Sequence, residues 1–262
     1  MLGRVWRRVG WVAFGLALVS ALGSCRRPRR TQNWGVLLGA EASPVTATGG
    51  GMSSEEVVGG VHVMAQGAER DDDWLSYRGR IDLGFGGNAE AGWAGHAGLD
   101  AQFGFAFFDG TEHLFARLGL LGLVEEDPWT SLYLLEVPTL FFGYEHHGED
   151  ADDPWHIDVG PRVSLASAMR VRAPQGHEHD VVAGPGTGAA ALVMTNFVSA
   201  EITYMHYFAD GDVDLLRASL CFGALIGVCL DTRHLFAPFG GGWEHTGYWG
   251  IRFGFGVITG IE

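Results

Sequence analysis

The stretch from Phe197 to Phe208 reads Phe-Val-Ser-Ala-Glu-Ile-Thr-Tyr-Met-His-Tyr-Phe and alternates between apolar and polar side chains. One face collects most of the large apolar groups, and the other collects Ser199, Glu201 and Thr203. A period of two is the signature of a β-strand with one apolar and one polar face. The stretch therefore predicts a strand whose two sides meet different environments.

The segment around Arg252 repeats this alternation with one addition, a polar face made almost entirely of glycine. The apolar face carries Trp249, Ile251, Phe253, Phe255 and Val257, and the opposite face carries Gly250, Arg252, Gly254 and Gly256. Bulky apolar groups on one side, with small or charged groups on the other, fit the wall of a closed barrel with a crowded interior.

Alternating segments follow one another along most of the chain. They cover residues 57–67, 75–86, 90–107, 112–124, 131–145, 155–171, 180–194, 197–208, 213–229 and 245–259. Turn-forming runs rich in Gly, Asp, Asn and Pro separate them. Many exceed the roughly 5–6 residues of a globular strand and reach the roughly 9–11 residues of a tilted membrane strand. We predict an all-β fold, an antiparallel up-and-down β-barrel of about ten strands, with eight or twelve as alternatives.

Charged side chains gather on the polar face of these segments. We predict that they form a charge network in the lumen, made of Arg78, Arg80, Asp82, Asp100, Arg117, Asp158, Arg162, Glu201, Arg217 and Arg252. A charge inside a narrow lumen is costly unless it is paired, and the forked guanidinium of arginine suits contacts with carboxylates. The remaining acidic residues concentrate in connections, above all 146–154 and 231–244, which we expect to face a partner or the medium.

The N-terminus has the features of an export signal. Arg4, Arg7 and Arg8 precede an apolar run of about fifteen residues, which is short for a spanning helix. The run ends at Cys25 in Leu-Gly-Ser-Cys, which resembles the bacterial lipobox and implies lipidation of Cys25. We therefore expect residues 1–25 to be a lipoprotein-type signal peptide, 26–56 a linker or short extra strand, and 57–262 the barrel.

Over roughly residues 57–259 the pattern and length of the segments resemble a small bacterial outer-membrane β-barrel. The resemblance implies contact with outer-membrane lipid, an outer-membrane location and a structural or surface-interaction role. Two alternatives stay open at this stage. One is a soluble, lipid-anchored barrel that binds a small apolar ligand, and the other is an outer-membrane lipid hydrolase.

Composition and motifs argue against several other functions. The net charge of -14 disfavours nucleic acid, whose binding depends on clustered basic residues. The histidines of the Glu145-His146-His147 and His177-Glu178-His179 runs lie at strand ends or in connections without a fixed geometry, so no metal is expected. His206 lies on the opposite face of its strand from Ser199 and Glu201, which excludes a local catalytic pair. We expect no cofactor and no enzymatic activity.

Two cysteines remain beyond Cys25. Cys221 and Cys229 are eight residues apart and would lie about 26 Å from each other in one continuous strand. A turn between residues 223 and 227 would instead allow a disulfide in an oxidising compartment. We favour two unpaired thiols.

Overall fold

The computed structural model describes the chain from residue 32 to residue 261 with short gaps. The described residues are 32–49, 52–70, 75–88, 92–107, 112–126, 131–147, 155–172, 178–181, 184–195, 197–208, 212–223, 226–239 and 242–261. The expected signal peptide and Cys25 lie outside them. No helix in this part of the chain has the length and apolar character needed to cross a membrane.

The described chain is made of β-strands. The first seven are β1 (Gln32–Gly49), β2 (Met52–Arg70), β3 (Leu75–Asn88), β4 (Gly92–Phe107), β5 (Glu112–Glu126), β6 (Ser131–His147) and β7 (His156–Ser164). The other seven are β8 (Ser167–Arg172), β9 (Glu178–Val181), β10 (Gly186–Met194), β11 (Val198–Tyr207), β12 (Val213–Gly223), β13 (Ile226–Phe239) and β14 (Gly242–Ile261).

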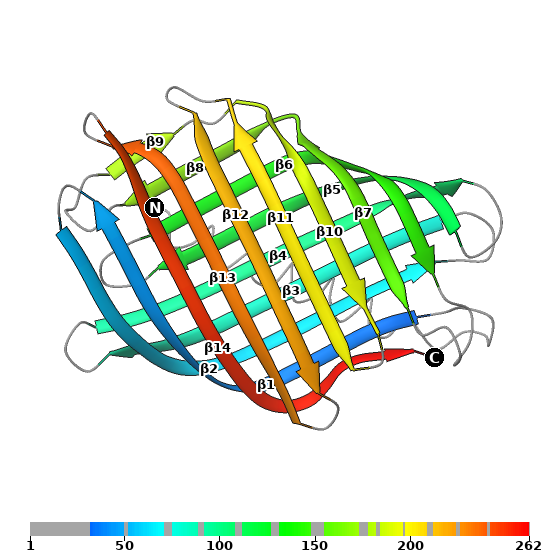
Figure 1. Cartoon of the computed structure of the whole chain (residues 1–262), viewed down its shortest axis with the longest axis horizontal. Helices are drawn as coiled ribbons and strands as arrows, with labels where there is room; N and C mark the ends of the chain where they lie inside the picture. The colour runs from blue at the N-terminus through cyan, green and yellow to red at the C-terminus, as the bar shows by residue number, and fades with distance from the viewer. Residues whose placement is uncertain are drawn as a thin grey trace, which may run out of the picture. The chain divides into compact units, whose positions relative to one another are not determined.

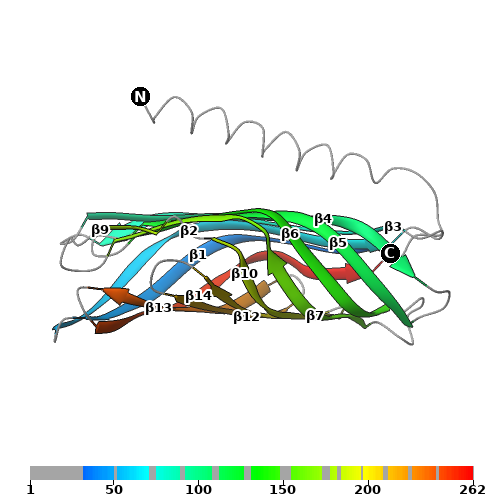
Figure 2. The ribbon, with the colours of Figure 1, turned by 90° about the horizontal axis from the view of Figure 1, so that it is seen from above.

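The strands form one antiparallel sheet that closes on itself (Figures 1 and 2). β1 pairs with both β2 and β14, so the first and last strands meet. β8 continues β7 along β6 in the same register, and β9 continues β10 in the same way. The closed circuit therefore has twelve strands, which corrects the expected ten to the higher of the two alternatives.

Two of the strands were not recognised from the sequence. β1 lies within 26–56, where a linker or a short extra strand was expected, and it is a full strand of the barrel wall. The expected segment 213–229 is not one strand, because it contains β12 and the beginning of β13, which pair with each other as antiparallel neighbours. The expected connection 231–244 was also wrong, because β13 reaches Phe239 and β14 begins at Gly242.

The turn between β12 and β13 brings the two cysteines together. Gly223 has a φ of 133°, a backbone conformation that glycine adopts without steric cost and that reverses the chain here. Cys221 and Cys229 then face each other across the hairpin and form a disulfide. The expectation of two unpaired thiols was therefore wrong.

Closure of the barrel brings two glycines into contact. Gly39 of β1 lies opposite Gly254 of β14, and a Cβ on either residue would overlap backbone atoms of the other strand. The two strands can approach this closely only because both residues lack a side chain. We call the end where β1 begins and β14 ends the terminal end of the barrel, and the opposite end the distal end.

Candidate functional site in the barrel lumen

The two faces of the wall differ sharply in chemistry. Large apolar side chains are exposed on the outside of nearly every strand, and Phe255, at 75% exposure, is the extreme case. The inward positions carry the charges, and Glu136 and Asp158 are both 0% exposed. Because side chains alternate across a strand, the register of β4 that exposes Phe103 and Phe105 on the outside buries Asp100 inside.

Five of the expected lumen residues meet in one network between β3 and the wall formed by β11 to β14. The carboxylate of Glu201 forms ion pairs with Arg78 at 2.8 Å and with Arg80 at 3.2 Å. Asp82 accepts from Arg80 at 3.2 Å and also pairs with Arg252. These contacts join strands on opposite sides of the lumen, so the network ties the two walls together.

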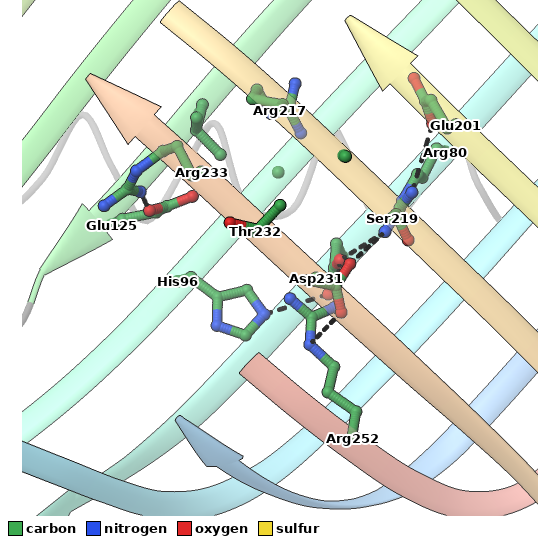
Figure 3. A pocket seen from close by; sticks show the side chains of 14 residues that line it. Arg80, His96, Glu125, Glu201, Arg217, Ser219, Asp231, Thr232, Arg233 and Arg252 are labelled. Atoms are coloured by element: carbon green, nitrogen blue, oxygen red, sulfur yellow. Dashed lines mark hydrogen bonds and ion pairs between the residues drawn. The ribbon is translucent and has the colours of Figure 1, made fainter. Parts of the chain in front are cut away.

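This first network also contains residues that were not expected. Asp231 of β13 lies 3.3 Å from Nε of Arg252 and 3.5 Å from Arg80. Arg233, on the same strand, pairs with Glu125 of β5 (Figure 3). Both residues were missed because 231–244 was interpreted as a connection, although alternation with the exposed Leu230 marks them as inward positions.

A small pocket lies inside the first network (Figure 3). Its volume is about 50 Å³, which is room for a few water molecules. Arg217 lines it beside Ser219 and Thr232. The positive charge of Arg217 attracts the carboxylate of Glu201, although Arg217 takes no part in the ion pairs described above.

A second network centres on Arg162 of β7. Its guanidinium donates to Asp100 at 3.2 Å and to Glu136 at 3.0 Å. The hydroxyl of Tyr207 on β11 donates a hydrogen bond to the other oxygen of Glu136, and Gln102 donates one to Asp100 at 3.0 Å. Glu136 and Tyr207 were not among the expected site residues, although their place in the strand alternation could have identified them.

A third network lies nearer the terminal end and centres on Arg117 of β5. Arg117 donates to Asp158 at 2.6 Å and to Glu145 at 3.1 Å. Its Nε also donates to the hydroxyl of Ser76 at 2.7 Å. The structure thus brings together nine of the ten expected residues in ion pairs and puts Arg217 beside them.

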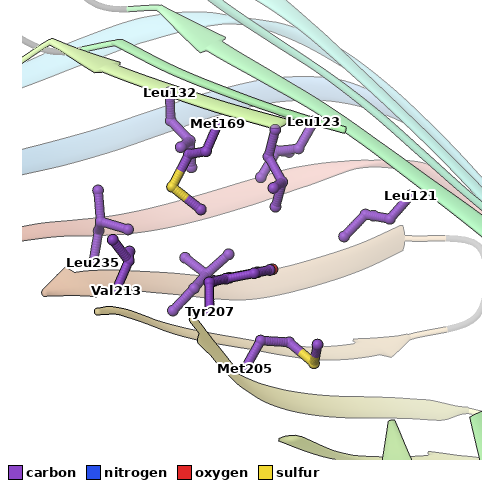
Figure 4. Packing of buried hydrophobic residues seen from close by; sticks show 10 residues of the cluster. Leu121, Leu123, Leu132, Met169, Met205, Tyr207, Val213 and Leu235 are labelled. Carbon is purple, nitrogen blue, oxygen red and sulfur yellow. The ribbon is translucent and has the colours of Figure 1, made fainter. Parts of the chain in front are cut away.

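Apolar side chains fill the lumen on either side of the charges. A cluster of ten occupies the distal end, namely Leu121, Leu123, Leu132, Leu134, Met169, Met205, Tyr207, Val213, Leu215 and Leu235 (Figure 4). Smaller groups lie toward the terminal end, such as Leu37 and Met64 beside the disulfide. Buried apolar clusters of the described residues thus lie on both sides of the charged networks.

His206 lies outside the lumen. Its Nδ1 is 2.9 Å from Asp214 on β12, and its ring contacts Phe208 edge to face. Ser199 and Glu201 point inward from the same strand. The arrangement keeps the imidazole away from Ser199, as the strand alternation predicts.

Comparisons with known proteins give structural likenesses only. No family model matches, and no curated protein matches significantly. An outer-membrane channel from Pseudomonas putida F1 has a TM-score of 0.41 and 13% identity, covering 88% of this chain and 97% of that chain. The translocator domain of the autotransporter NalP from Neisseria meningitidis has a TM-score of 0.34 and 12% identity, covering 97% and 98%.

Proposed function

We propose that the chain is a bacterial outer-membrane β-barrel lipoprotein, lipidated at Cys25, with a filled lumen and a structural or surface-interaction role. It spans the outer membrane, contacts lipid through its outer wall and conducts no solute through an open pore. The proposal assigns it no enzymatic activity.

The main support for this proposal is that the barrel exposes its apolar side chains and buries its charged ones. A protein dissolved in water rarely exposes contiguous apolar surface larger than a few hundred Å². Here side chains such as Phe85, Leu118 and Phe253 are 52–64% exposed and come from strands all around the wall. In a bilayer the same side chains would face lipid, and the closed hydrogen-bonded sheet would leave no backbone group unsatisfied.

The filling of the lumen supports a closed barrel rather than a pore. The guanidinium groups of Arg117 and Arg162 are each about 1% exposed and are held by carboxylates from other strands. A water-filled channel would leave such groups hydrated. Ion pairs across the lumen and the apolar cluster at the distal end both oppose the passage of ions.

The same geometry weakens the two alternatives. A soluble barrel with an apolar ligand would need its apolar face inside, whereas Leu99 and Phe103 lie on the outer side of the strand that buries Asp100. A hydrolase built on β11 would need His206 beside Ser199, and the two point to opposite sides of the wall.

Reconstitution tests the proposal directly. We expect the folded protein to require detergent, to run faster on a gel before boiling than after it, and to insert into liposomes. In planar bilayers it should give no steady conductance. A version without Cys25 that stays soluble and shows no heat-dependent mobility would refute membrane insertion. A large steady conductance would refute the closed lumen.

A further inference from the structure

We infer that the third network contains a divalent transition-metal site formed by Glu145, His156 and Asp158. Each residue offers one ligand atom, and these three atoms lie within 4.8 Å of one another. All three side chains are at most 1% exposed. The inference goes beyond the proposed function, since nothing in the barrel wall or its closure requires a metal.

The strand register builds this site at the terminal end of the lumen. Glu145 of β6 lies directly opposite Asp158 of β7, and His156 lies two residues from Asp158 on the same face. His113 of β5, which is also buried, lies opposite Glu145 on the other side. Opposed residues in adjacent strands have Cβ atoms about 4.5–5.5 Å apart, so two imidazoles and two carboxylates share one small region.

Arg117 contacts both carboxylates but leaves one oxygen of Glu145 available. Its guanidinium donates to Oε2 of Glu145 and to Oδ2 of Asp158, with a longer contact of 3.4 Å to Oδ1 of Asp158, and Ser76 donates to the same Oε2 at 3.3 Å. Oε1 of Glu145 is buried and has no hydrogen-bond partner among the described residues. A buried carboxylate oxygen without a partner is costly, so this atom points to a ligand on that side.

The distances suit coordination by nitrogen and oxygen. Nε2 of His156 is 3.2 Å from Oδ1 of Asp158. Two ligands each about 2.0–2.2 Å from a tetrahedral zinc ion lie roughly 3.4 Å apart, close to this separation. A modest movement of the Glu145 side chain would bring its free oxygen to the same ion.

The local charge also favours a cation. Glu145 and Asp158 carry two negative charges against one positive charge on Arg117, in a region almost without solvent. Imidazole and carboxylate together suit zinc and related ions rather than calcium.

This inference revises the expectation that the chain holds no metal. That expectation weighed the runs at 145–147 and 177–179 and did not consider His156. Glu145 belongs to both sets, but its partners come from the next strand rather than from its own neighbours. Only the register, which a sequence does not specify, brings the three residues together.

Zinc titration of the folded, detergent-solubilised full chain tests the site. After chelator treatment, we expect calorimetry and elemental analysis to find one tight zinc ion per chain. His156→Ala and Glu145→Gln should each weaken binding by about 100-fold or more. His206→Ala is the matched control, because it removes an imidazole paired with an aspartate on the outer wall, and it should leave this binding unchanged.

Two results would overturn the inference. One is the absence of tight zinc binding in the wild-type chain, which would leave Glu145 and His156 as parts of an ion-pair network only. The other is tight binding that survives both site substitutions. Should His156→Ala fail to give the heat-modifiable folded form, Glu145→Gln decides alone, since glutamine keeps the size of the side chain and unchanged binding would refute the site.

Discussion

Arg162→Met removes the charge at the centre of the second network and keeps most of the length of the side chain. The arginine is 1% exposed and holds Asp100 at 3.2 Å and Glu136 at 3.0 Å. Its loss leaves two buried carboxylates, each with one remaining hydrogen-bond donor, Gln102 or Tyr207. Breaking a buried ion pair from one side costs about 3–5 kcal/mol, whereas an exposed pair is worth about 0–1 kcal/mol.

We therefore expect Arg162→Met to lower the free energy of unfolding by about 4 kcal/mol. Denaturant titration in detergent, followed by tryptophan fluorescence and heat-dependent gel mobility, measures this change. Val163→Met is the matched control, because Val163 lies next in the strand and faces outward. A surface substitution of this kind should change the free energy of unfolding by less than about 0.5 kcal/mol.

A second variant separates charge pairing from packing. Adding Glu136→Gln to Arg162→Met removes one of the stranded charges, so the double variant should be less destabilised than the sum of the two single changes by about 1–3 kcal/mol. Asp100→Ala alone should be milder than Arg162→Met, because the arginine keeps Glu136. If Arg162→Met costs less than about 1 kcal/mol, the arginine is hydrated, and the closed lumen on which the proposed function depends is wrong.

Three further outcomes are expected. Leu99→Asp puts a carboxylate in the lipid-facing wall and should destabilise the folded form, by less than the roughly 2–4 kcal/mol that Arg or Lys costs at the bilayer midplane, whereas Leu99→Ala should be mild; equal effects in denaturant titration would contradict the outward direction of this side chain. Cys25→Ser should abolish lipidation, so an unchanged mass of the mature protein would exclude Cys25 as the anchor. Replacing Cys221 and Cys229 together by serine should lower the free energy of unfolding by about 2–3 kcal/mol, and identical unfolding of the oxidised wild type and the variant would argue against the disulfide.

The alternation of side chains made the two faces of the wall predictable. A strand that carries Asp100 between Leu99 and Ala101 can put its charge on only one side, and the same holds for Arg162 and Arg252. The alternation of side chains along one strand depends only on that strand, so the two faces can be assigned without knowing which strands are neighbours. This is why the ten expected lumen residues all fall on strands of the barrel wall.

The missed strands have local physical causes. β1 carries Gly35, Gly39 and Pro44, which weaken the usual pattern of a strand. In the sequence, Gly223 is followed by Ala224 and Leu225, which give no typical turn signal. The reversal depends on Gly223 and on pairing with β14 further along the chain. Such long-range pairing has no local signal.

The choice of ion-pair partners was also beyond the sequence. Arg117 pairs with Asp158, 41 residues away, and Arg252 pairs with Asp82, 170 residues away. Each pair depends on the stagger of strands around the closed barrel, which fixes the height of every inward residue. The sequence indicated which residues face the lumen, but the stagger decides which of them meet.

The number of strands bears on why this lumen needs such long polar side chains. An eight-stranded barrel has an interior that ordinary side chains fill, and the diameter grows with each added strand. With twelve strands, short aliphatic groups alone would leave a channel along the axis. The largest fully buried side chains are Arg117, Arg162, Tyr207, Phe115 and Phe141, all long enough to extend far from the wall. A buried arginine can occupy this space only where carboxylates pair with it, so under the proposed function the paired charges are also what closes the lumen. It follows that a variant that shortens Arg117 and Arg162 together should be the first to conduct ions.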